Sequence, residues 1–86
     1  MKSQMTDERI EELALLLSQQ LTAAIAVWEL AMTILPINSR EYRAVCMAGK
    51  RTDKAYQQLR FLAEDRQWSS ERLRQVFTVN GAYEWN

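Results

Sequence analysis

Few residues of this chain could carry chemistry. Its 86 residues contain one cysteine, Cys46, and no histidine. Zinc sites built from four cysteine and histidine ligands are therefore excluded, and so is acid–base catalysis by histidine. A lone cysteine without a histidine base is a poor nucleophile, so we expect Cys46 to be a small buried residue. Because no pair of nucleophile and base can be named, we expect no enzyme, and we expect no cofactor or metal.

Acidic side chains cluster near the N-terminus, where Glu8, Glu11 and Glu12 follow one another closely. Acids are favoured in the first turns of a helix, beside the positive end of its dipole. We therefore expect these three side chains to form a solvated face. Glu29 is different, because it is the only charge in a long apolar run, and Arg43 is its expected partner across a helical hairpin.

Basic side chains gather in the second half of the chain, although the total net charge is zero. Acids are in excess over residues 1–35 and bases are in excess over residues 36–74. The simplest interpretation is two neighbouring helices of complementary charge. The alternative is a basic face that binds DNA or a small anionic ligand such as a nucleotide. Its candidate contacts are Arg43, Lys50, Arg51, Lys54 and Gln57.

The longest apolar stretch of the chain runs from Leu21 to Leu35. It is the second half of a longer helical pattern, because apolar residues recur every three or four positions. Thr6 is the expected N-cap, and Pro36 ends the pattern. We predict one helix over about residues 7–35. The apolar seam of this helix consists of Ile10, Ala14, Leu17, Leu21, Ala24, Trp28, Ala31 and Leu35.

A second apolar line runs beside this seam on the same helix. Two lines exceed what one partner helix covers, and a helix that is apolar around most of its circumference is buried on most sides. We therefore expect the second line to pack against a third helix of the chain or against another chain. Its residues are Leu16, Ala23, Val27, Leu30 and Ile34.

A second helix is predicted over about residues 39–66, with Ser39 as its N-cap. The short connection after Pro36 places it antiparallel to the first helix. Gly49 costs about 1 kcal/mol relative to alanine inside a helix, so we expect a bulky side chain such as Trp28 to pack on its bare backbone. The alternative is a break at Gly49, which would make residues 40–66 a helix-turn-helix for DNA.

A shorter third helix is predicted over about residues 70–77, with Ser69 as its N-cap, and it is our candidate to cover part of the second apolar line. Asn80-Gly81 is a strong hairpin signal, so the tail over residues 78–86 could form a small β-hairpin. The aromatic side chains nearby could lie in the core, or they could contact a partner, because tryptophan and tyrosine dominate interface hot spots. They are Trp68, Tyr83 and Trp85.

We therefore predict a single all-α domain, a long antiparallel two-helix hairpin with a short third helix and a C-terminal tail. Small helical hairpins of this layout resemble, in architecture, the co-chaperones of secretion-system needle subunits and phage-encoded anti-defence proteins. The shared features are the length, the Leu35-Pro36 turn and the tyrosine-bearing second helix, and the chain contains no motif specific to either group. The resemblance implies a small adaptor or inhibitor, such as a phage or mobile-element accessory protein.

The function we expect is non-enzymatic and depends on protein–protein contact, with a partner or with further copies of the chain as a homo-oligomer. DNA binding and anionic-ligand binding are the alternatives. We expect a cytoplasmic protein without membrane contact, because the apolar run is shorter than the about 20 residues of a membrane helix. The expected interface residues are Leu16, Ala23, Val27, Leu30, Ile34, Trp68, Tyr83 and Trp85.

Overall fold

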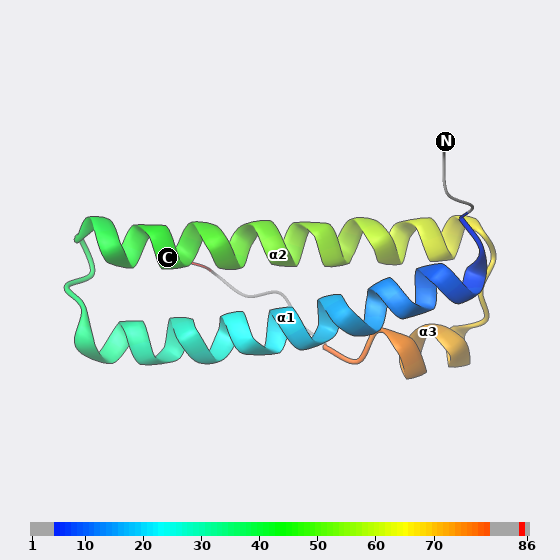
Figure 1. Ribbon diagram of the computed structural model, residues 1–86, viewed down its shortest axis with the longest axis horizontal. Helices are drawn as coiled ribbons and strands as arrows, with labels where there is room; N and C mark the ends of the chain where they lie inside the picture. Colours follow the sequence, from blue (N-terminus) through cyan, green and yellow to red (C-terminus); the bar gives the residue numbers. More distant parts are fainter. Residues whose placement is uncertain (1–4, 80–84, 86) are drawn as a thin grey trace.

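The computed structural model describes residues 5–79 and residue 85, and these form three α-helices. Helix α1 spans Asp7–Ile34, α2 spans Arg40–Asp65 and α3 spans Ser70–Val76. The two long helices lie antiparallel and side by side, and α3 lies at the end away from their connection (Figure 1). The predicted all-α hairpin with a short third helix is confirmed, and each helix begins and ends within one residue of its predicted bounds.

All three helices begin at hydroxyl caps that the sequence predicts. The side-chain oxygens of Thr6, Ser39 and Ser69 each accept a hydrogen bond from the backbone N–H three residues on, at 3.1–3.2 Å. Each cap satisfies one of the N–H groups that the first turn of a helix leaves without a partner. Helix α1 ends because Leu35 adopts an extended conformation, which the following Pro36 favours.

The core lies between the two long helices and beneath α3. Its largest fully buried side chains are Tyr56, Phe77 and Leu21. Phe77, which follows α3, packs on Tyr56 with ring centroids 5.4 Å apart and on Trp68 with centroids 6.2 Å apart. Cys46 is buried, as expected. These contacts attach α3 to the hairpin through aromatic packing rather than through the second apolar line of α1.

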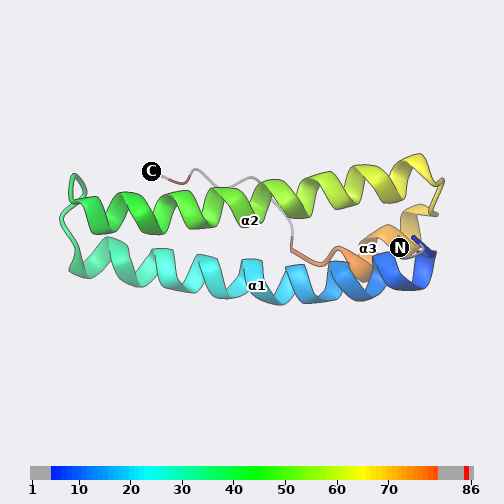
Figure 2. The same cartoon turned by 45° about the horizontal axis from the view of Figure 1, so that its top comes forward.

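The third helix does not cover the second apolar line, so that expectation is wrong. In Figure 2, α3 and residues 77–79 are drawn between the two long helices, toward the end away from their connection, and α3 is next to Glu11 and Leu15 of α1. The second line lies elsewhere on α1, and its large side chains stay more than half exposed. The reason is that Phe77, which follows α3, packs against Tyr56 of α2 and against Trp68, and this packing draws α3 away from the second line.

Helix α2 runs without a break through Gly49, so residues 40–66 do not form a helix-turn-helix. The indole of Trp85 lies directly on Gly49. It also contacts Trp28, with ring centroids 5.3 Å apart, and its Nε1 donates to Asp53 Oδ2 at 3.1 Å. A bulky side chain therefore covers the glycine as expected, but it is Trp85 and not Trp28. The predicted turn of the β-hairpin lies outside the described residues, and neither 77–79 nor Trp85 is in a strand.

We expect Gly49→Ala to destabilise the protein, although alanine favours a helix over glycine by about 1 kcal/mol. The added β-carbon would collide with the indole ring of Trp85 and displace it. Burying a large apolar side chain contributes about 1.5–3 kcal/mol, so the loss exceeds the helical gain. Urea unfolding should show a lower midpoint for Gly49→Ala. In a Trp85→Ala background the same substitution should raise the midpoint, and a rise in both backgrounds would contradict the Trp85 contact.

Candidate interaction surface

One face of the hairpin is largely apolar and exposed along most of α1. We call it the open face and define it by Leu13, Leu16, Gln20, Ala23, Val27, Leu30 and Ile34. These residues are spaced alternately three and four apart, as the a and d positions of a heptad are. The side chains of Val27, Leu30 and Ile34 are 54%, 60% and 66% exposed. Such side chains are suited to pack against another helix.

The open face contains five of the interface residues that the sequence predicts. They are Leu16, Ala23, Val27, Leu30 and Ile34, and all five are exposed. Sequence reasoning missed Leu13 and Gln20, which continue the same spacing. The signal for Leu13 was present, because a step of three back from Leu16 reaches another leucine. Gln20 was overlooked because it is polar.

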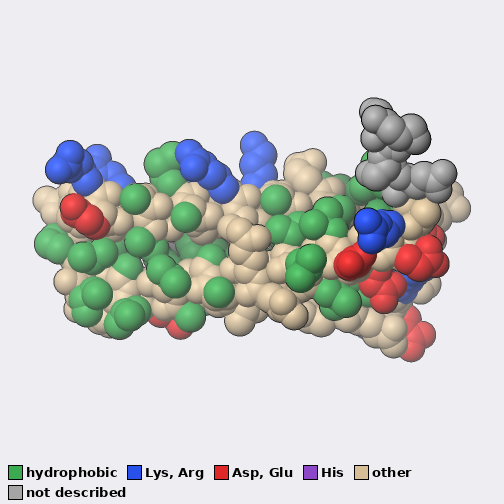
Figure 3. Space-filling model, viewed as in Figure 1, with side chains coloured by type: hydrophobic (Ala, Val, Ile, Leu, Met, Phe, Trp, Pro, Cys, Tyr) green, Lys and Arg blue, Asp and Glu red, His purple; other side chains and the backbone are tan. Residues whose placement is uncertain are grey.

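A shallow groove of about 420 Å³ lies between α1 and α2 beside the open face. Its lining is uncharged, and more than half of its residues are alanine or glycine. Short side chains on two facing helices cannot fill the space between the helices, which explains the hollow. Figure 3 shows hydrophobic side chains over both long helices in the half of the molecule near their connection. The lining residues are Gln20, Ala23, Ala24, Val27, Ala44, Val45, Ala48, Gly49 and Thr52.

The aromatic residues that were predicted to contact a partner are not part of the open face in the described part of the chain. Trp68 is 8% exposed and Trp85 is 4% exposed, so both belong to the core of this chain. Tyr83 lies outside the described residues. The structure therefore favours the core alternative for both tryptophans, and the candidate surface is aliphatic.

A cluster of ion pairs joins the start of α1 to the chain around α3. Asp7 accepts a hydrogen bond from Arg66 Nε at 2.8 Å, and Arg72 bonds to Glu11 at 3.0 Å and lies 3.7 Å from Asp7. The Arg72 guanidinium also lies 4.2 Å from the centre of the Trp68 ring. Glu11 is therefore a partner of Arg72 and not part of a purely solvated face. Each exposed pair contributes at most about 1 kcal/mol, and this cluster holds the helix ends together.

We expect Asp7→Asn to remove a contribution to the stability of the fold that is present at neutral pH and is lost in acid. The hydrogen bond from Arg66 is the main cause that holds the pKa of Asp7 below its ordinary value of 3.8, and the neighbouring Trp68 and Arg72 add to it. A lowered folded-state pKa stabilises the fold above the unfolded pKa, and this contribution is lost as pH falls through the folded pKa. The difference in Tm between wild type and Asp7→Asn should therefore be present at neutral pH and vanish on acidification below pH 3.8. A constant difference at every pH would contradict this pairing.

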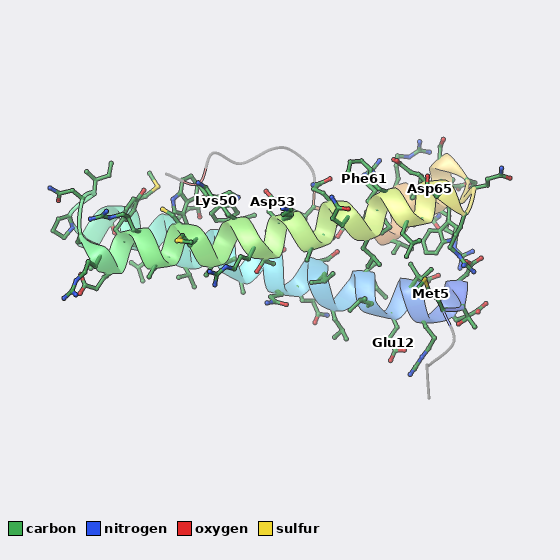
Figure 4. The ribbon with its side chains drawn as sticks, turned by 90° about the horizontal axis from the view of Figure 1, so that it is seen from above. Met5, Glu12, Lys50, Asp53, Phe61 and Asp65 are labelled. Carbon is green, nitrogen blue, oxygen red and sulfur yellow. The ribbon has the colours of Figure 1, made fainter. Side chains whose placement is uncertain are left out.

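The exposed basic residues of α2 form a stripe away from the groove. Lys50 and Asp53 lie along the same edge of α2 (Figure 4). Asp53 interrupts the stripe, and it accepts from Trp85 at 3.1 Å and from Gln57 Nε2 at 3.4 Å. Lys50, like Arg51 and Lys54, is exposed and does not line the groove. Gln57, a predicted ligand contact, therefore lies next to Asp53, and the cations of α2 do not surround a common pocket.

The expected pair between Glu29 and Arg43 does not form. The Arg43 guanidinium donates instead to the backbone carbonyl of Asn38 at 3.2 Å, in the connection between the long helices. Glu29 is exposed, and none of the salt bridges in the described part of the chain involves it. The single charge of the apolar run is therefore solvated and not paired.

Within the described residues, α1 is long and apolar enough to cross a membrane by length and composition. An 18-residue stretch of this 28-residue helix has a mean hydropathy of 1.4, and only 17% of the stretch is buried. The argument that the run is too short therefore holds for Leu21–Leu35 but not for the whole helix. One such helix is weak evidence, because core helices of water-soluble proteins and signal sequences pass the same test.

Comparisons of the chain with protein-family models, with curated proteins and with solved structures return no match. The function is therefore inferred from the residues of this chain alone.

Proposed function

We propose that this protein is a small non-enzymatic adaptor or inhibitor that acts by protein–protein contact, and that the open face of α1 is its contact surface. The observation that carries the proposal is the exposure of Val27, Leu30 and Ile34 in one uncharged line. Soluble proteins rarely leave a contiguous apolar patch of this kind in water, and such patches mark interaction sites. The line follows a heptad spacing, which suits a helical partner.

The charges around the open face favour a protein partner over a lipid surface. Helices that lie on membranes carry lysine and arginine along the rim of their apolar face. Arg9, in the first turn, is the only cation of α1. A cytoplasmic location agrees with the unpaired thiol of Cys46, since thiols stay reduced there.

A photo-crosslinking experiment in the cells that produce the protein tests this proposal. A photoreactive phenylalanine analogue is placed at Leu30 on the open face or, as a matched control, at Phe61 on α2, which is 52% exposed. We expect adducts of defined mass from position 30 and none from position 61. Adducts to lipid alone, or equal adducts from both positions, would overturn the proposal.

A further inference from the structure

We infer that the protein on the open face is a second copy of this chain, with its α1 antiparallel to α1 of the first, so that two hairpins form a four-helix bundle. The inference rests on the proposed function and names its partner. The first observation that supports it is the width of the apolar stripe on α1. The open face and the seam against α2 lie side by side on this helix. A helix with such a stripe contacts two neighbours, as helices in four-helix bundles do.

The charge of the open face permits pairing with itself. None of its seven residues is charged, so two copies meet without repulsion between like charges. The a positions of the heptad are Leu13, Gln20, Val27 and Ile34. The residues directly before them, on the outer flank of the open face, are Glu12, Gln19, Ala26 and Thr33. A parallel pair would place the two Glu12 carboxylates side by side. An antiparallel pair centred on residue 25 separates them by roughly 40 Å along the axis and opposes the helix dipoles.

The groove supplies the shape that such a pair requires. In an antiparallel pair centred on residue 25, Val27 of the second copy lies opposite Ala23, and Leu30 lies opposite Gln20. Both Ala23 and Gln20 line the groove, whose other walls include Ala44 and Ala48. Val27 of the second copy therefore meets a hollow lined by small side chains, and Leu30 meets the uncharged Gln20 at the same groove. The two-fold axis repeats this fit, so each copy offers the same ridge and the same groove.

The area of the open face approaches what a stable dimer needs. Its five large aliphatic side chains are 47–66% exposed, and Ile37, in the connection that follows α1, is 74% exposed. Together they expose apolar surface on the order of 600 Å², the upper end of what one patch of a monomer spans. A standard interface buries about 800 Å² on each partner, so this face and the groove supply most of it.

Cysteine crosslinking of the purified full chain tests the arrangement. In a Cys46→Ala background, Leu16→Cys and Ile34→Cys place one thiol near each end of the open face. In the antiparallel pair Leu16 lies opposite Ile34 of the second copy, while the two copies of Leu16 are roughly 25–30 Å apart. We therefore expect a disulfide-linked dimer when the two variants are mixed and oxidised, and none from either variant alone. Both positions are more than half exposed, so neither substitution disturbs the hairpin core.

The possible results distinguish a failure of the second-copy inference from a failure of the proposed function. Crosslinking of each variant with itself would overturn the antiparallel arrangement, and no crosslinking in any mixture would overturn the second copy as partner. A mixture of Met47→Cys and Phe61→Cys, both exposed on α2, is the control for random collision. If position 30 forms adducts with a different protein in cells while the purified variants do not crosslink, the proposed function stands and the second-copy inference fails.

Discussion

Replacing Leu30 with glutamate is expected to leave the hairpin folded and to dissociate the proposed dimer. Leu30 is 60% exposed in the single chain, so a carboxylate there stays hydrated in the monomer. In the proposed dimer it would face the uncharged open face of the second copy and lose that water. Burying an unpaired charge costs about 3–5 kcal/mol, which corresponds to an increase of more than about a hundredfold in the dissociation constant.

The matched control is Met47→Glu, which introduces the same charge at a side chain that is 52% exposed on α2 and does not line the groove. Sedimentation velocity should show the monomer for Leu30→Glu and the wild-type species for Met47→Glu. Circular dichroism should show the same helix content for both variants. If the Leu30→Glu variant sediments as the wild type does, the open face is not the interface.

Replacing Phe77 with alanine is expected to cause the largest loss of stability that a single truncation produces in this chain. Phe77 is 1% exposed and joins α3 to the rings of Tyr56 and Trp68. Truncating a buried phenylalanine costs about 3–5 kcal/mol, from the lost burial and from the cavity that remains. Natural domains have only about 5–15 kcal/mol in total, so we expect α3 to detach and the remaining hairpin to be marginal.

The chain supplies its own control, because Phe61 is its only other phenylalanine and is 52% exposed. Phe61→Ala should change the free energy of unfolding by less than about 0.5 kcal/mol. Urea denaturation of both variants, followed by circular dichroism, measures the difference. Equal effects at the two positions would show that α3 is not held by the packing of Phe77.

The helices could be predicted from the sequence because their signals are local. The hydroxyls of Thr6, Ser39 and Ser69 lie three residues before the N–H groups that they accept from, and Pro36 acts on its immediate neighbour. Periodicity then identified the first long helix and its apolar seam. These signals depend on spacing within one segment, so they need no knowledge of the rest of the fold.

The placement of α3 could not be predicted, because it depends on contacts between distant segments. Both sides of α1 offer apolar side chains, and the choice between them follows from the packing of Phe77 on α2. The ion pair of Arg66 with Asp7 joins residues 59 positions apart. For the same reason the sequence indicated that a bulky group covers Gly49 but not that the group is Trp85. The open face was visible as a line of residues, but its exposure depended on which side α3 takes.

The most direct test is the mass of the purified full chain by sedimentation equilibrium, compared with that of the Leu30→Glu variant. We expect the wild type to converge, as concentration rises, on twice the 10.1 kDa mass of one chain, and the variant to remain at the mass of one chain. A wild-type mass of 10.1 kDa across the whole concentration range would contradict the second copy on the open face.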